Sequence, residues 1–305
     1  MLVIDSQIHA YERNHPGRPW ASPTMPGLQE VDGPMLVNAM EEVGVDGAIL
    51  VSPWALYGYD ADYVTSVRND YPDLFALVLP VDPRAADVEQ IVADWSRVPG
   101  AVGIRIMLRP GTSAGSGEAF QHGWPSQLPI FTDVGDSDLH RCFAAATRHS
   151  MTINLSCWGN TKLAAALAAR HPDCRIVLDH VGLMQPIAPP APPDAFDGLP
   201  GVLELARHDN IAIKLTGIAT LSREAFPHDD LWDPLARIFD AFGFQRCIWG
   251  SDWTRTVDFL SYREAADLFR KSTRISHGEL AALMGGTLRD FYGWEPAGQL
   301  VERQV

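Results

Sequence analysis

The sequence has few cysteines and no long apolar run. Its four cysteines form no CxxC pair, so neither a disulfide framework nor a cysteine zinc site is predicted. No segment approaches the roughly 18 uninterrupted apolar residues of a membrane span, and no basic start with an apolar run opens the chain. We therefore expect a cytoplasmic protein with reduced cysteines and no membrane partner. The cysteines are Cys142, Cys157, Cys174 and Cys247.

Positive charge is also scarce. Lys and Arg number 24 against 38 Asp and Glu, which gives a net charge of −14. Such a surface repels phosphate backbones, so we expect no nucleic-acid partner. The first strand-like segment is not followed by GxGxxG, and the chain contains no GxxxxGK[ST], so the usual nucleotide-binding motifs are missing.

The composition is that of an ordinary globular chain. Its 305 residues are 46% hydrophobic and 20% charged, enough for one large core and outside the range of disordered chains. Short apolar or β-branched segments recur eight times, with helical patterns such as 138–150, 161–171 and 233–242 between them. The eight strand-like segments are 2–5, 47–52, 75–80, 101–107, 151–156, 175–180, 211–216 and 247–252.

Eight strands that alternate with helices predict a closed (β/α)8 TIM barrel, one domain over residues 1–305. A doubly wound open sheet is the alternative. Two long insertions, 108–135 and 182–196, follow strand ends and are expected to wall a pocket or to decorate the surface. The segment 279–294 is expected to pack under the barrel as one or two helices.

Side chains alternate between the two faces of a strand, so parity assigns residues to the lumen. In the fourth segment Val102, Ile104 and Ile106 are expected to face the helices, and Arg105 to face inward. In the fifth, Ile153, Leu155 and Cys157 face the helices. Asp5, Gln7 and His9 are expected to share one face of the first strand and its exit.

Ionisable groups gather on the inner face of the predicted barrel. They are costly in a core unless they are paired or used, so their convergence on one lumen indicates a functional site. The residues are His9, Arg105, His180, Lys214 and Asp252.

Four motifs at these strand ends, IDSQIHAYE, IVLDHVG, IAIKLTG and CIWGSDW, resemble the amidohydrolase superfamily. The resemblance is to its amidohydrolase-2 branch of lactonases, which act on pyrone dicarboxylates and sugar lactones, and of related decarboxylases. It implies a histidine pair at the first strand, a histidine at the sixth and an aspartate at the eighth. His9, His180 and Asp252 match, whereas Gln7 replaces the first histidine and Arg105 replaces a metal-bridging lysine.

The exchange of histidine for Gln7 weakens a metal site, because a neutral carboxamide oxygen binds zinc or manganese less well than imidazole. We therefore expect no metal and no other cofactor. The resemblance implies that some lactonases of this branch work without metal. In such a site Asp252 is the general base toward water, and His180, His9 and Arg105 polarise the ester carbonyl.

Each assignment has a structural alternative. Asp252 could cap the next helix or pair with Arg255. Arg105 must meet an anion, either a buried carboxylate such as Asp5 or a carboxylate of the substrate. Lys214 favours a structural pairing.

The substrate-binding set is expected to lie in the same pocket. Gln7 is placed there to bond substrate or water, against a purely structural amide bond. Tryptophans that follow strands would form an apolar wall, which favours an aromatic-derived or hydrophobic small-molecule substrate. The expected substrate-binding residues are Gln7, Trp54, Trp158, Arg13 and Ser52, and the other rim tryptophans are Trp20, Trp124 and Trp253.

These observations together favour a hydrolase that opens a lactone without a metal. A metal-dependent decarboxylase or hydrolase of the same superfamily is the alternative enzyme, and a non-catalytic barrel that binds an aromatic acid is the third reading. The sequence leaves the oligomeric state open, a homo-oligomer included.

Overall fold

The structure is a computed structural model that describes residues 1–21, 27–108, 131, 135–186 and 189–298. Eight parallel strands form one sheet, and each strand pairs with the next one along the chain. The strands are β1 (Ile4–Ile8), β2 (Gly47–Val51), β3 (Phe75–Pro80), β4 (Ala101–Met107), β5 (Thr152–Ser156), β6 (Ile176–Leu178), β7 (Ile211–Lys214) and β8 (Cys247–Ile248).

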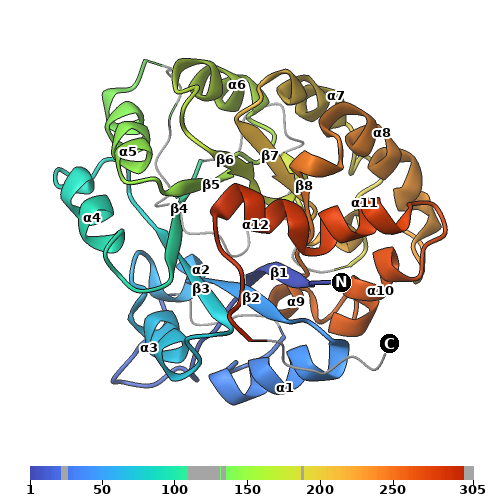
Figure 1. The fold of residues 1–305 in the computed structure, drawn as a ribbon, viewed down its shortest axis with the longest axis horizontal. Coiled ribbons are helices and arrows are strands. Elements are labelled where there is room, and N and C mark those ends of the chain that lie inside the picture. The colour runs from blue at the N-terminus through green and yellow to red at the C-terminus, as the bar shows by residue number, and fades with distance from the viewer. Residues whose placement is uncertain (22–26, 109–130, 132–134, 187–188, 299–305) are drawn as a thin grey trace.

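Backbone hydrogen bonds join the two ends of this sheet. The amide of Ser6 donates to the carbonyl of Trp249 at 3.3 Å, and the amide of Asp252 donates to the carbonyl of Gln7 at 3.0 Å. The strands therefore run in chain order around a nearly closed barrel, and the predicted (β/α)8 fold is confirmed (Figure 1). The alternative of a doubly wound sheet is wrong, because its strand order would reverse at a switch point.

Helices surround the strands (Figure 1). The three helices expected at 138–150, 161–171 and 233–242 are present as α5, α6 and α8. Polar caps fix several starts: Ser261 and Glu264 form a capping box at α10. The α-helices are α1 (Gly33–Val43), α2 (Trp54–Tyr57), α3 (Asp62–Asp70), α4 (Val88–Trp95), α5 (Ser137–Arg148), α6 (Thr161–Arg170), α7 (Leu199–Leu203), α8 (Trp232–Phe242), α9 (Trp253–Thr256), α10 (Tyr262–Arg270), α11 (His277–Ala281) and α12 (Thr287–Tyr292).

Short helical turns of other kinds complete the described chain. One is the π-helical turn η7, which leads into α12. None of the described helices is both long and apolar enough to cross a bilayer. The turns are η2 (Asp179–Gly182), η3 (Glu204–Arg207), η4 (Ile218–Leu221), η5 (Asp229–Leu231), η6 (Phe244–Arg246) and η7 (Ala282–Gly286).

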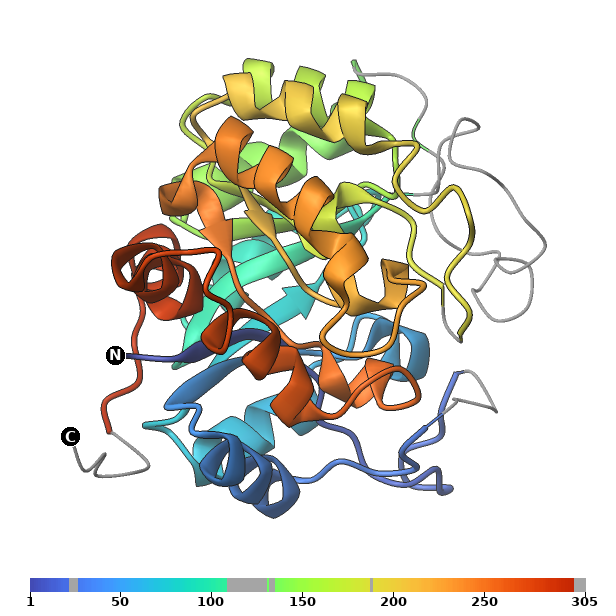
Figure 2. The ribbon, with the colours of Figure 1, turned by 90° about the vertical axis from the view of Figure 1, so that its right-hand side faces the viewer.

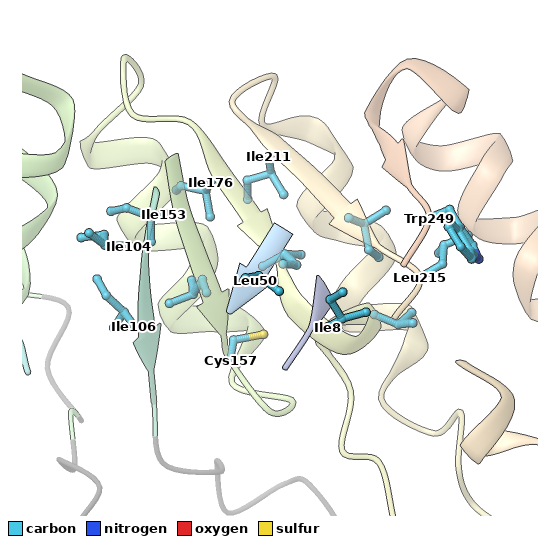
Figure 3. Close-up of a cluster of buried hydrophobic side chains, with 14 of the residues drawn as sticks. Ile8, Leu50, Ile104, Ile106, Ile153, Cys157, Ile176, Ile211, Leu215 and Trp249 are labelled. Carbon is cyan, nitrogen blue, oxygen red and sulfur yellow. The ribbon is translucent and has the colours of Figure 1, made fainter. Parts of the chain in front are cut away.

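The layer between strands and helices is a continuous apolar core. Ile153, Leu155 and Cys157 of β5 and its exit belong to it and are fully buried, as parity predicts. Figure 3 shows such side chains from most of the strands, Ile104, Ile176 and Ile211 among them. This layer fixes the faces of the strands, because a one-residue slip would move all its side chains to the other side.

A second apolar cluster fills the N-terminal half of the lumen and is called the floor cluster here. The helix α12 lies across that end of the barrel and contributes Leu288 and Tyr292, which confirms that this segment packs under the barrel (Figures 1 and 2). Because apolar side chains occupy most of this end, the charged residues of the lumen gather at the other. The strand members are Ile4, Ile49, Val51, Ala76, Val78, Val102, Val177, Ala212 and Ile248.

Strict alternation fails in β1 and β4. Val102 was predicted to face the helices, but it lies in the floor cluster while Ile104 stays outside. The pairing of β4 with β3 shifts there, from Leu77 with Ala101 to Val78 with Gly103. An inserted residue of this kind moves the side chains before it to the opposite face of the strand. The prediction for Val102 is wrong for this reason.

Candidate active site

Buried polar side chains gather where the strands end opposite the floor cluster. Trp158, His180 and Asp252 follow β5, β6 and β8, and each has a left-handed backbone, with φ of 47°, 55° and 52°. Such φ values are unfavourable for residues with a Cβ, so they persist only where surrounding contacts hold them, often at functional sites. The chain turns sharply at all three strand ends.

His9 and Asp252 face each other across the junction of β1 and β8. The Nδ1 of His9 lies 2.7 Å from the carbonyl oxygen of Val51, which can only accept, so Nδ1 carries the proton. The other ring nitrogen, Nε2, lies 3.3 Å from Oδ1 of Asp252. The strand ends thus bring together two residues that the sequence assigned to catalysis.

His180 lies on the other side of Asp252, with Nδ1 3.6 Å from Oδ2. Its Nε2 lies 3.0 Å from Nη2 of Arg105, and because a guanidinium only donates, Nε2 accepts and Nδ1 carries the proton. Burial lowers the pKa of His180 to about 3, with Arg255 and Arg105 adding to the effect of burial and Asp252 opposing it. His180 is therefore a neutral imidazole, and the indole of Trp158 stacks on it at 5.4 Å.

Arg105 meets Asp179, not Asp5. Its Nε donates to Oδ2 of Asp179 at 2.8 Å, and Nζ of Lys214 lies 3.1 Å from Oδ1 of the same carboxylate. Burial raises the pKa of Asp179, but Lys214 and Arg105 outweigh that effect and hold the pKa well below its usual range. The structural pairing expected for Lys214 is present, and two cations share one buried anion.

Parity predicted that Asp5 shares the inner face of β1 with Gln7. In the structure Asp5 does not lie on that face. Its carboxylate accepts hydrogen bonds from the amide and the hydroxyl of Ser251 at 2.9 and 2.5 Å, at the junction of β1 and β8. The pairing of β1 with β2 is irregular between Asp5 and Ile8, so alternation is lost there. Burial raises the pKa of Asp5 to about 6.

Gln7 lies between two members of the polar group. Its Oε1 accepts from Nζ of Lys214 at 3.3 Å, and its Nε2 lies 3.3 Å from Nε2 of His180. Lysine can only donate, so the amide must be oriented with its oxygen toward Lys214. Both ends of the amide therefore have protein partners.

Asp252 also forms the ion pair that the sequence offered as its structural alternative. Nε of Arg255 donates to Oδ2 at 2.5 Å. Burial raises the pKa of the carboxyl, but Arg255, followed by His9 and His180, outweighs burial and lowers the pKa far below its usual range. Asp252 is thus fully ionised at neutral pH, with Oδ2 paired and Oδ1 facing His9.

The remaining substrate-binding candidates are distributed unevenly. Trp54 is buried against Met107 at the end of β4. The hydroxyl of Ser52 donates to the carbonyl of Asp60 at 2.5 Å, so it serves the loop after β2. Arg13 pairs with Glu30 at 2.8 Å through a side chain that is 68% exposed, and the structure does not bring it to the polar group.

The other rim tryptophans have packing partners. The indole of Trp20 donates to the carbonyl of Glu12 at 3.0 Å, and Trp253 stacks on Tyr262 at 5.2 Å. Trp124 lies outside the described residues. Of the described tryptophans, Trp158 is the one that contacts a member of the polar group through a ring stack.

The sequence matches the amidohydrolase family over residues 4–294. This chain belongs to the amidohydrolase family. The suspected resemblance is therefore confirmed, and with it the assignment of the chain as a hydrolase.

Known amidohydrolase relatives cover most of the chain. It is 28% identical to an L-fucono-1,5-lactonase from Burkholderia ambifaria, over 82% of this chain and 79% of that one. It is 25% identical to a 4-sulfomuconolactone hydrolase from Rhizobium radiobacter, over 79% and 70%. A crystal structure of an amidohydrolase from Burkholderia multivorans with bound zinc has a TM-score of 0.75 and 27% identity, over 97% of this chain and all of that one.

Three of the donor atoms that could bind a zinc or manganese ion are already paired with cations, whereas Nε2 of His9 and Oδ1 of Asp252 are not. The oxygen of Gln7 accepts from Lys214, Nε2 of His180 accepts from Arg105, and Oδ2 of Asp252 accepts from Arg255. Each of these donor atoms already faces a cation, which a divalent ion would have to displace. Within the described ranges, no three His, Cys, Asp or Glu side chains are placed to hold a metal.

Sequence reasoning missed two members of the site. Asp179 precedes His180, and alternation would have sent these neighbours to opposite faces; the left-handed turn at His180 lets both contact the polar group. Gln185, from the second insertion, accepts from Nη2 of Arg255 at 2.6 Å. Only a sequence signal for the turn after β6, such as the glycine at position 182, could have pointed to them.

Proposed function

We propose that this amidohydrolase opens a lactone by attack of water assisted by Asp252, without a metal. The single observation that carries the proposal is the placement of an ionised carboxylate, with one oxygen free of cations, between His9 and His180. The two relatives named for lactone hydrolysis support the reaction class. The cations paired with Gln7, His180 and Oδ2 of Asp252 support a reaction without a metal.

In the proposed reaction Oδ1 of Asp252 takes a proton from water as the water oxygen attacks the lactone carbonyl. The carbonyl oxygen gains negative charge, which Arg105 stabilises through hydrogens not used in its bonds to Asp179, Ser156 and His180. The ring C–O bond then breaks, and Asp252 returns its proton to the leaving oxygen. The product is an open hydroxy acid, which ionises and releases one proton at neutral pH.

The imidazoles of His9 and His180 lie on either side of the carboxylate. A neutral His180 carries its proton on Nδ1, toward Asp252 and Thr216. Through this N–H group His180 stabilises negative charge that forms beside Asp252. His9 donates its Nδ1 hydrogen to the carbonyl of Val51, so in this tautomer its Nε2 presents a lone pair toward Oδ1 and supplies no donor there.

For the substrate we propose an aromatic-derived or hydrophobic lactone. The indole of Trp158 above His180 and the buried Trp54 beside Met107 support a flat apolar ligand. The four buried, unpaired cysteines are compatible with a cytoplasmic location, which is part of this proposal.

The test is proton release from a panel of sugar 1,5-lactones, muconolactones and pyrone carboxylates by purified enzyme. We expect turnover that survives chelation, with no stoichiometric metal by elemental analysis. Asp252→Asn should lower kcat by about 10² to 10⁴, the usual contribution of a general base. Asp94→Asn, which breaks an exposed ion pair with Arg97 at the same sequence spacing, is the matched control.

Two results would contradict the proposal. A stoichiometric zinc or manganese whose removal abolishes turnover would replace it by the metal-dependent alternative. A loss below threefold in Asp252→Asn would remove this residue from the role of base.

A further inference from the structure

A closed ring of polar contacts surrounds the outer side of Asp252. Nε of Arg255 donates to Oδ2 of Asp252 at 2.5 Å, and Nη2 donates to Oε1 of Gln185 at 2.6 Å. Nε2 of Gln185 donates to the carbonyl of Thr216 at 2.9 Å. The hydroxyl of Thr216 accepts from the amide of His180 at 3.0 Å, and Nδ1 of His180 lies 3.6 Å from Oδ2 of Asp252, a contact too long for a hydrogen bond. The ring ties together the exits of β6, β7 and β8.

A glycine leaves the space in which this ring closes. A Cβ at Gly217 would lie 2.4 Å from Nη2 of Arg255 and 2.4 Å from Oε1 of Gln185. The φ of Gly217 is also 63°, which residues with a side chain rarely adopt. The backbone after β7 is thus shaped around the contact between Arg255 and Gln185.

The ring treats the two oxygens of Asp252 differently. Oδ2 receives Arg255 and faces His180, whereas Oδ1 faces Nε2 of His9 at 3.3 Å. Arg255 lies in α9, three residues after Asp252, and its guanidinium reaches back to the carboxylate. Gln185 holds that guanidinium in place through its own hydrogen bond. The plane of the carboxylate is therefore fixed by Arg255 of α9, which Gln185 of the segment after β6 holds in place.

We propose that Arg255 and Gln185 are positioning residues, which hold Asp252 so that Oδ1 is the single oxygen that receives the proton from water. This inference rests on the proposed role of Asp252 as general base. It adds a division of labour: Arg255 supplies a charge and an orientation, and Gln185 supplies orientation alone.

The two contributions are separable by pH. The charged or titratable groups that face Asp252 are His9 from the exit of β1, His180 from that of β6, Lys214 from β7 and Arg255 from α9. Arg255 is the strongest of those that lower the pKa of Asp252. Its removal should raise this pKa, whereas loss of Gln185 leaves Arg255 in place and should not.

The first experiment compares Arg255→Gln and Arg255→Lys in kcat, KM and the pH profile of kcat/KM. A misplacement of about 1 Å can cost about 100-fold in rate, so we expect Arg255→Gln to lower kcat by about that factor. In the wild type, the fall of kcat/KM that accompanies protonation of Asp252 (the acid limb) is absent above about pH 4. In Arg255→Gln this limb should move to higher pH, into the measurable range. Arg255→Lys should keep the wild-type limb and recover only part of kcat, because an ammonium lacks the guanidinium fork.

The second experiment uses Gln185→Leu, which removes both amide contacts and no charge. We expect kcat to fall by about tenfold, a part of the effect of misplacement, with the acid limb unchanged. Arg97→Gln alters an exposed ion pair with Asp94 just after α4, and Gln90→Leu alters an exposed amide contact on α4. Both variants should match the wild type. Thermal melts check that each variant is folded, and if Arg255→Gln is not, Gln185→Leu and Arg255→Lys carry the test.

Failure of the inference and failure of the proposed function look different. Wild-type kcat and an unshifted acid limb in the Arg255 and Gln185 variants would overturn the inference while Asp252→Asn still inactivates the enzyme. Full activity of Asp252→Asn would instead remove the base itself. An acid limb that shifts equally in both variants would show that Gln185 acts through charge, against the proposed division.

Discussion

The two ends of the barrel lumen are built from the same strands but by opposite means. At the N-terminal end the floor cluster is apolar, and α12 covers it with Leu288 and Tyr292. At the other end, charged side chains are buried within one network, and the backbone adopts left-handed turns. The comparison teaches that stability and chemistry are assigned to different ends, as in other barrels.

Lys214 and Tyr292 connect the two ends. Nζ of Lys214 lies 6.0 Å above the ring of Tyr292, and the hydroxyl of Tyr292 donates to Oδ1 of Asn154 at 2.5 Å. Tyr292 belongs to the floor, whereas Lys214 pairs with Asp179 in the site. Substitutions at the two ends should therefore separate effects on stability from effects on activity.

The largest effect is expected for Asp179→Asn, which leaves Arg105 and Lys214 without their shared anion. Removal of one partner from a buried ion pair costs about 3–5 kcal/mol. The free energy of unfolding, from denaturant titration, should fall by that amount, together with activity. Asp94→Asn on the surface should change it by less than about 1 kcal/mol, and an equally small change at Asp179 would contradict the assignment.

At the floor, Leu288→Ala should cost stability without affecting the chemistry. Truncation of a fully buried leucine destabilises by about 2–5 kcal/mol. We expect kcat and KM within about twofold of the wild type, measured well below the melting temperature. A large fall in kcat in the folded variant would mean that the two ends are coupled. Met35→Ala, at a position 36% exposed, is the control.

His180 should make stability depend on pH. Its pKa is about 3 in the folded protein and about 6.5 in an unfolded chain, so the unfolded state binds the proton first. Stability should therefore fall as the pH is lowered from about 6.5, by about 1.4 kcal/mol per pH unit. Denaturant titrations between pH 7 and 5 should give a flatter dependence for His180→Asn, and parallel curves would refute a neutral buried His180.

The smallest effect is expected for Arg13→Ala. An exposed ion pair contributes about 0–1 kcal/mol, and the partner of Arg13 is Glu30. Melting temperature and KM should stay close to the wild type. A large rise in KM would instead place Arg13 on the substrate, as the sequence suggested.

Most of the fold could be predicted from the sequence because strands and helices carry their own periodicity. All eight strands and the helix under the barrel were found in this way. Alternation failed at Val102 and Asp5, because an irregular pairing leaves no trace in apolar patterning. Within the site, His9, His180 and Asp252 could be placed from their positions at strand ends.

The partners of these residues were harder to predict. Asp179 was missed because the left-handed turn at His180 overrides alternation. Arg255 was identified as a potential partner of Asp252 from its spacing, but Gln185 comes from a loop whose path depends on tertiary contacts. Sequence periodicity reports which face a side chain takes in a regular strand, and the site is built where the strands have ended.

The floor cluster also bears on biosynthesis. It joins Ile4 to Leu288, residues that lie far apart in the sequence. A ribosome delivers the chain from the N-terminus at about 5–20 residues per second, so the lumen cannot be sealed until the last helices have emerged. Until then the apolar strand residues of the floor cluster lack the cover that Leu288 and Tyr292 provide.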